Sequence, residues 1–74
     1  MQTEDAERLL VVFNREVGDE GMAAHWEDSY IIHLVANWRS GETDCGQPLN
    51  GAVLLHKIPI VELLCSRCAE AYAV

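Results

Sequence analysis

The spacing of apolar residues near the N-terminus predicts an amphipathic helix over residues 3–17. Acidic residues, Glu4 and Asp5, come first, where negative charge suits the helix dipole, and Gly18 is a natural stop. Apolar side chains recur between them at helical intervals and share one face. The residues of this stripe are Ala6, Leu9, Leu10, Phe13 and Val17.

Two valines flank the stripe and widen the apolar face of the predicted helix. Isolated valines on a protein surface are common and need no function. A widened apolar face is also what a helix presents to a second chain. We therefore select Leu10, Val11 and Val12 as candidate partner-binding residues, for another protein or for a second copy in a homodimer.

Residues 30–36 carry apolar side chains with a period of two, which predicts a β-strand. Turn-forming residues follow, and residues 42–45 are expected to return as the second arm of a β-hairpin. Residues 52–58 are apolar enough for a third strand. The segment 18–28, ahead of the hairpin, is expected to be a loop that contains a short helical turn.

Pro59 leaves two interpretations of the C-terminal part open. Proline suits the first position of a helix, so a single helix can begin there and run through Tyr72. Alternatively, residues 60–64 form a strand that leads to Cys65, and the helix begins near Ser66. We favour the second interpretation.

Four potential metal ligands follow one another as H-x11-C-x19-C-x2-C, namely His33, Cys45, Cys65 and Cys68. Structural zinc takes four such ligands in a tetrahedron, and Cys3His is one of its usual sets. The C-x2-C turn allows two sulfurs to reach one ion, and the predicted hairpin supplies the other two ligands. A chain of 74 residues has little interior of its own, and small domains often add a metal.

The histidine ligand and the metal are less constrained than the cysteines. His33 is preferred because it lies on the predicted strand, whereas His25 falls in the loop and His56 in an apolar segment. Asp44 is a candidate to accept a hydrogen bond from the ligand histidine. Zinc is the default for a closed tetrahedral site, although spacing alone does not separate zinc from iron. Cysteines that merely fill a core, or a redox pair at Cys65 and Cys68, are the competing interpretations.

Together these features predict an α+β fold in which zinc stabilises a small domain of the zinc-ribbon or treble-clef kind. The expected elements are an N-terminal amphipathic helix, a β-hairpin plus a third strand, and a C-terminal helix after the C-x2-C. One domain is expected over residues 1–74, with the helix at 3–17 and a zinc-binding core at 30–72.

The chain carries a formal net charge of −7, and half of its residues are hydrophobic. This composition predicts a folded protein that repels phosphate backbones at long range. The acidic N-terminus lacks the basic and apolar regions of a secretory signal, and no apolar run approaches the roughly 18 residues of a membrane span. A cytoplasmic location is therefore expected, where thiols more often bind metal than form disulfides.

Three short motifs together resemble a known group of proteins. They are Ile31-Ile32-His33-Leu34, Thr43-Asp44-Cys45-Gly46 and Cys65-Ser66-Arg67-Cys68. Their order is similar to that of short zinc-finger-like proteins of actinobacteria and their phages, over roughly residues 30–72. The resemblance implies zinc binding in a bacterial or phage cytosol, and it implies no particular chemistry.

Four protein ligands leave no open position for substrate on the ion, so the chain is not expected to be an enzyme. The favoured function is a zinc-binding protein-interaction module, a regulator whose acidic surface steers it to a basic partner. The alternative is a nucleic-acid-binding zinc finger, which needs a local basic and aromatic patch. Its candidate residues are Trp38, Arg39, Lys57 and Arg67.

Overall fold

The predicted N-terminal helix is present over its full length. We analysed a computed structural model, which describes residues 3–58 and 61–72. Helix α1 spans Thr3–Val17, and a turn of 3-10 helix, η1, continues it over Gly18–Glu20. Gly18 adopts a positive φ of 62°, so the predicted helix stop is confirmed.

The apolar stripe of α1 faces the interior. Ala6, Leu9 and Phe13 are buried, whereas Val11 keeps 64% of its surface exposed. The helix is therefore held by one face, as its period predicts.

Three short strands form one antiparallel sheet with the order β2-β1-β3. Strand β1 spans Met22–His25, β2 spans His33–Val35 and β3 spans Val53–Leu55. Ala24 lies opposite His33 on one side and opposite Leu54 on the other, so β1 is the central strand.

The expected loop over residues 18–28 is wrong where β1 lies. The central strand contributes Ala23 and Ala24, which are exposed by 1% and 0%. Alanine has a low strand propensity, and two adjacent buried alanines show no alternation. The position of the segment between two neighbours overrides its local preference.

The expected second arm of the hairpin is also wrong. Residues 42–45 form a turn rather than a strand, with one isolated bridge between Glu42 and Pro48. The backbone N–H of Asp44 donates to Leu34 O over 2.8 Å, which still places this turn beside β2. The strand that pairs with β2 is β1, from upstream in the chain.

The C-terminal helix begins where the favoured interpretation predicted. Helix α2 spans Ser66–Glu70, directly after Cys65. The residues before it form a 3-10 turn, η3, over Val61–Leu63, rather than the expected strand. Within the described residues of this segment, Leu64 pairs with Ile32 in an isolated parallel bridge. Pro59, on which the alternative rested, and Ile60, the first residue of the expected strand, lie outside the described residues.

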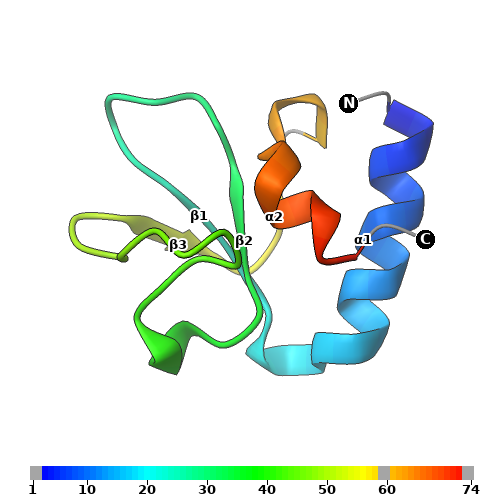
Figure 1. The fold of residues 1–74 in the computed structure, drawn as a ribbon, viewed down its shortest axis with the longest axis horizontal. Coiled ribbons are helices and arrows are strands. Elements are labelled where there is room, and N and C mark those ends of the chain that lie inside the picture. The colour runs from blue at the N-terminus through cyan, green and yellow to red at the C-terminus, as the bar shows by residue number, and fades with distance from the viewer. Residues whose placement is uncertain (1–2, 59–60, 73–74) are drawn as a thin grey trace.

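The hydrophobic core lies where α1, α2 and β2 meet, and Figure 1 shows α2 between α1 and the sheet. The rings of Phe13 and Tyr72 meet edge to face at 5.0 Å between centroids. The buried residues of this cluster are Leu9, Phe13, Leu34, Leu64, Cys68, Ala69 and Tyr72.

The predicted α+β class, with an N-terminal helix, three strands and a short C-terminal helix, is confirmed. No helix in the described part of the chain is long and apolar enough to cross a membrane.

Candidate metal centre

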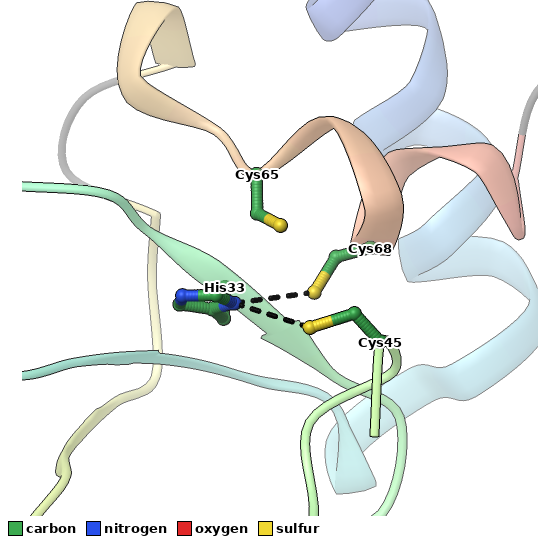
Figure 2. Close-up of side chains that lie close together, drawn as sticks. All are labelled: His33, Cys45, Cys65 and Cys68. Carbon is green, nitrogen blue, oxygen red and sulfur yellow. Dashed lines mark hydrogen bonds between the residues drawn. The ribbon is translucent and has the colours of Figure 1, made fainter. Parts of the chain in front are cut away.

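Four side chains from three separate segments converge beside the core. They are His33, Cys45, Cys65 and Cys68, and their potential ligand atoms all lie within 4.8 Å of one another. Figure 2 shows the imidazole and the three thiol groups turned toward a common point. The structure thus brings together the four residues that the sequence analysis selected.

Each segment delivers its ligand through ordinary backbone geometry. His33 opens strand β2, and Cys45 lies in the turn that is tied to β2. Cys65 occupies the position just before α2, and Cys68 lies in its first turn. The backbone N–H of Cys65 donates to Ile32 O over 2.7 Å, which anchors the start of α2 beside the histidine.

The distances to the histidine fit a single tetrahedral ion. Nδ1 of His33 lies 3.5 Å from Sγ of Cys45 and 3.6 Å from Sγ of Cys68. Zinc bonds of about 2.3 Å to sulfur and 2.0–2.1 Å to nitrogen place tetrahedral neighbours about 3.6 Å apart. Nδ1 is therefore the nitrogen placed to bind the ion. Ligands within 4.8 Å of one another suit one metal atom rather than a two-iron cluster, which separates its ligand pairs further.

The ring of His33 is fixed from one side by an indole. Trp26 meets it edge to face, with centroids 5.3 Å apart and planes at 86°. The indole N–H of Trp26 donates to Asn50 O over 2.8 Å, which holds the ring in place. Burial lowers the pKa of His33, which favours the neutral imidazole that a metal requires. The sequence analysis did not assign Trp26 to the site.

Cys45 lies in a turn that stabilises a thiolate. Gly46 has a φ of 91°, a conformation that other residues rarely adopt, and its N–H donates to Thr43 O over 2.9 Å. Burial alone raises the pKa of the Cys45 thiol. Hydrogen bonds from the Thr43 side chain, from Cys68, from the Gln47 backbone and from Cys65 outweigh burial and hold that pKa below its usual value.

Cys68 has the opposite environment. It is fully buried, and the pKa of its thiol is raised to about 12, chiefly by burial and against a lowering by the backbone N–H of Leu34. The neighbouring sulfurs of Cys45 and Cys65 contribute to this rise, because like charges disfavour one another. A divalent cation reverses this balance by displacing the proton and neutralising the thiolates.

Asp44 does not accept a hydrogen bond from the histidine. Its Oδ1 accepts from the backbone N–H of Ala36 over 2.9 Å, and its Oδ2 accepts from the hydroxyl of Tyr72 over 2.6 Å. Asp44 therefore braces the turn against β2 and the C-terminal segment. The expectation that Asp44 accepts a hydrogen bond from the ligand histidine is therefore wrong, because Ala36 and Tyr72 are its donors.

The two rival histidines lie outside the group. His25 ends strand β1 opposite Val53. His56 lines a surface hollow of about 280 Å³ with Leu10 and Phe13. Among the described residues, only His33 joins the three cysteines.

The candidate partner-binding residues have unequal surroundings. Val11 is largely exposed, whereas Leu10 and Val12 are half-buried and pack against the core cluster. Contact with a partner stays a prediction, and Val11 is the residue of the three that is free to make it.

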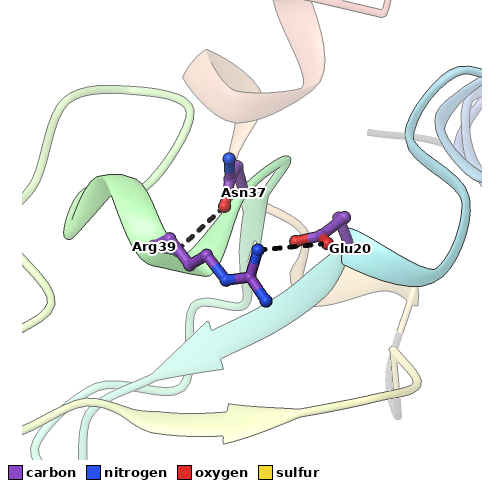
Figure 3. Close-up of polar contacts among 3 residues, drawn as sticks. All are labelled: Glu20, Asn37 and Arg39. Carbon is purple, nitrogen blue, oxygen red and sulfur yellow. Dashed lines mark hydrogen bonds and ion pairs between the residues drawn. The ribbon is translucent and has the colours of Figure 1, made fainter.

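The candidate nucleic-acid residues are spread over three segments. Trp38 and Arg39 lie on the 3-10 turn η2, Trp38–Ser40, with the guanidinium 5.2 Å from the indole centroid. Figure 3 shows Arg39 reaching Glu20, 3.8 Å away, while Asn37 Oδ1 accepts from the backbone N–H of Arg39. Lys57 follows β3 and Arg67 lies on α2. Arg39 thus makes an exposed ion pair, which leaves most of its side chain open to solvent.

Comparisons with known proteins add no assignment. Neither a protein-family model, nor a curated protein, nor a solved structure matches this chain. The interpretation of the site depends on the geometry of its own residues.

Proposed function

We propose that this chain is a non-catalytic module that holds one zinc ion through His33, Cys45, Cys65 and Cys68. The supporting observation is the placement of Nδ1 of His33 at 3.5 and 3.6 Å from two cysteine sulfurs, close to the edge length of a zinc tetrahedron. Three thiolates and one imidazole form a closed set, which leaves no position for a substrate.

The ion would join three parts of the chain that lie far apart in the sequence. The ligands come from β2, from the turn at Cys45 and from the start of α2. Structural zinc binding supplies on the order of 10 kcal/mol in small domains, which is comparable to the whole stability of such a chain. The metal therefore acts as part of the fold.

The function of the folded module is interaction with another protein. The net charge of −7 favours encounter with a basic surface, and Val11 on the outer face of α1 offers an apolar contact. The resemblance to short zinc-finger-like proteins of actinobacteria and their phages supports a bacterial or phage cytoplasm as the location of this module, and the regulatory role is part of the proposal. A homodimer through the same helix is the variant of this proposal.

The metal content of the purified chain tests the central point. We expect about one zinc per chain by elemental mass spectrometry after purification under reducing conditions. Cys68→Ser is expected to lose most of that zinc, whereas Ser66→Ala, between the two cysteines of the C-x2-C, retains it. EDTA is expected to melt the C-terminal part first and to leave α1 partly helical by circular dichroism.

A wild-type chain that is metal-free, cooperatively folded and unaffected by EDTA overturns the proposal. Stoichiometric iron in place of zinc retains the site and corrects the identity of the ion.

A further inference from the structure

Two polar side chains are buried in the described part of the chain, and both lie at the candidate metal centre. His33 is exposed by 8% and Thr43 by 4%. The hydroxyl oxygen of Thr43 lies 3.0 Å from Sγ of Cys45. A buried hydroxyl is costly unless it is hydrogen-bonded, so its partners indicate its role.

The direction of this hydrogen bond follows from the lack of a hydrogen on a metal-bound sulfur. The backbone N–H of Gln47 donates to Oγ1 of Thr43 over 3.0 Å, so the oxygen already accepts there. A hydroxyl has one hydrogen of its own to donate. A metal-bound Cys45 is a thiolate without a hydrogen, so Thr43 must be the donor and the sulfur the acceptor.

Backbone hydrogen bonds of the turn hold the hydroxyl beside the sulfur. The backbone N–H of Thr43 donates to Gln47 O over 2.9 Å, and that of Gly46 donates to Thr43 O over 2.9 Å. These bonds close both ends of the turn around the ligand. The position of the donor is therefore set by backbone groups of the turn.

We infer that Thr43 is a positioning residue of the metal centre, whose hydroxyl orients the Cys45 thiolate and thereby raises metal affinity. This inference rests on the proposed zinc site. A donor to a metal-bound sulfur restricts rotation of the cysteine side chain and stabilises the charged form that binds. Its removal should weaken zinc binding without removing any ligand.

Two substitutions separate the hydroxyl from the shape of the side chain. Thr43→Val keeps the branched shape and removes the donor, whereas Thr43→Ser keeps the donor and removes a methyl group. Ser40→Ala is the matched control, because the Ser40 hydroxyl also stabilises a turn, by donating to Asn37 O over 2.8 Å, outside the site.

The experiment measures zinc affinity by competition with a chromophoric chelator and records the sulfur-to-metal charge-transfer band with cobalt. Thr43→Val is expected to weaken zinc binding about 10- to 100-fold and to shift the cobalt band to lower energy. Thr43→Ser and Ser40→Ala are expected to match wild type in both measurements.

Equal affinities for Thr43→Val and wild type overturn the inference, and so does an equal loss in Thr43→Val and Thr43→Ser, which would assign the effect to the methyl group. A wild-type chain that binds no zinc overturns the proposed function itself, and the role of Thr43 with it. The two failures are therefore distinguishable.

Discussion

The hydroxyl of Tyr72 donates a hydrogen bond of 2.6 Å to Oδ2 of Asp44, next to the metal-ligand candidate Cys45. The other oxygen of Asp44 accepts from the backbone N–H of Ala36, just after β2. The ring of Tyr72 meanwhile packs against Phe13 of α1. These contacts of Tyr72 and Asp44 therefore link the C-terminal segment, the Cys45 turn, β2 and α1 without any metal ion.

Tyr72→Phe is expected to destabilise the zinc-loaded protein by about 1.5–3 kcal/mol, because a hydrogen bond to a charged group is lost while the ring remains. Urea unfolding measures the change. Tyr30→Phe is the control, since Tyr30 is 86% exposed and loses a hydroxyl that faces solvent. Equal stability of the two variants would contradict the prediction.

Tyr72 should also make the fold sensitive to alkaline pH. Burial, and then the bond to Asp44, raise the pKa of Tyr72 well above its ordinary value. Below about pH 10 the phenol is protonated in both states, and its stabilising contribution is fully present. At higher pH the unfolded chain releases the proton and the folded chain retains it, so the free energy of unfolding falls by about 1.4 kcal/mol per pH unit.

Unfolding free energies measured in a pH series for wild type and Tyr72→Phe test this sign. The two proteins differ in one ionisable group, so the difference between their unfolding free energies follows the phenol. Above about pH 10, the free energy of unfolding of wild type is expected to approach that of Tyr72→Phe. A difference that stays constant through that range would show that Tyr72 does not titrate with folding.

The three histidines should respond differently to substitution. His33→Ala removes the ligand nitrogen and is expected to reduce zinc affinity at least about 100-fold, since the ion loses one of four bonds. His25→Ala and His56→Ala leave the cluster intact and serve as controls. Chelator competition measures all three, and an unchanged affinity in His33→Ala with a loss in His25→Ala or His56→Ala would reassign the ligand.

Gly21 is required for space rather than for backbone freedom. Its φ of −74° suits any residue, but an added Cβ would lie 2.9 Å from the Phe13 ring. Gly21→Ala is therefore expected to cost about 1–3 kcal/mol in urea unfolding through overpacking. On a Phe13→Leu background the additional cost should shrink, and an unchanged cost in that double variant would rule out the ring as its cause.

Val11 is the site at which partner binding and folding should separate. Val11→Lys is expected to change the free energy of unfolding by less than about 0.5 kcal/mol, because the residue is exposed. Val12 packs against the core cluster, so Val12→Lys should destabilise the fold. Affinity capture from a cell extract tests binding to another protein, and sedimentation tests self-association. Wild type should show an interaction that Val11→Lys loses. Identical results for wild type and Val11→Lys would exclude the face of α1 that carries Val11.

The sequence predicted best those features that depend on local pattern. The stripe of Leu9 and Phe13 determines α1, and the position of Cys65 before Ser66 marks the start of α2. The metal ligands were predictable because few residue types bind zinc and the chain contains only three cysteines. These inferences need no knowledge of distant pairing.

The features that were missed depend on long-range contacts. Strand β1 contains Ala23 and Ala24, whose burial comes from neighbours on both sides of the central strand. Asp44 was assigned to the histidine because the approach of Tyr72 from the far end of the chain is not visible in sequence. Thr43 lies two residues before Cys45, and this spacing alone does not indicate a hydrogen bond. The folded turn is what brings the hydroxyl of Thr43 to the sulfur of Cys45.

Cys68 is at once a metal-ligand candidate and a member of the hydrophobic core, with none of its surface exposed. Binding of the proposed ion and closure of the apolar interior would therefore be one event at this residue. By mass action, the fraction of chains in the native form would then rise with the free concentration of that ion. Scarcity of the ion would then silence the protein by depleting its native population, with no separate sensor required.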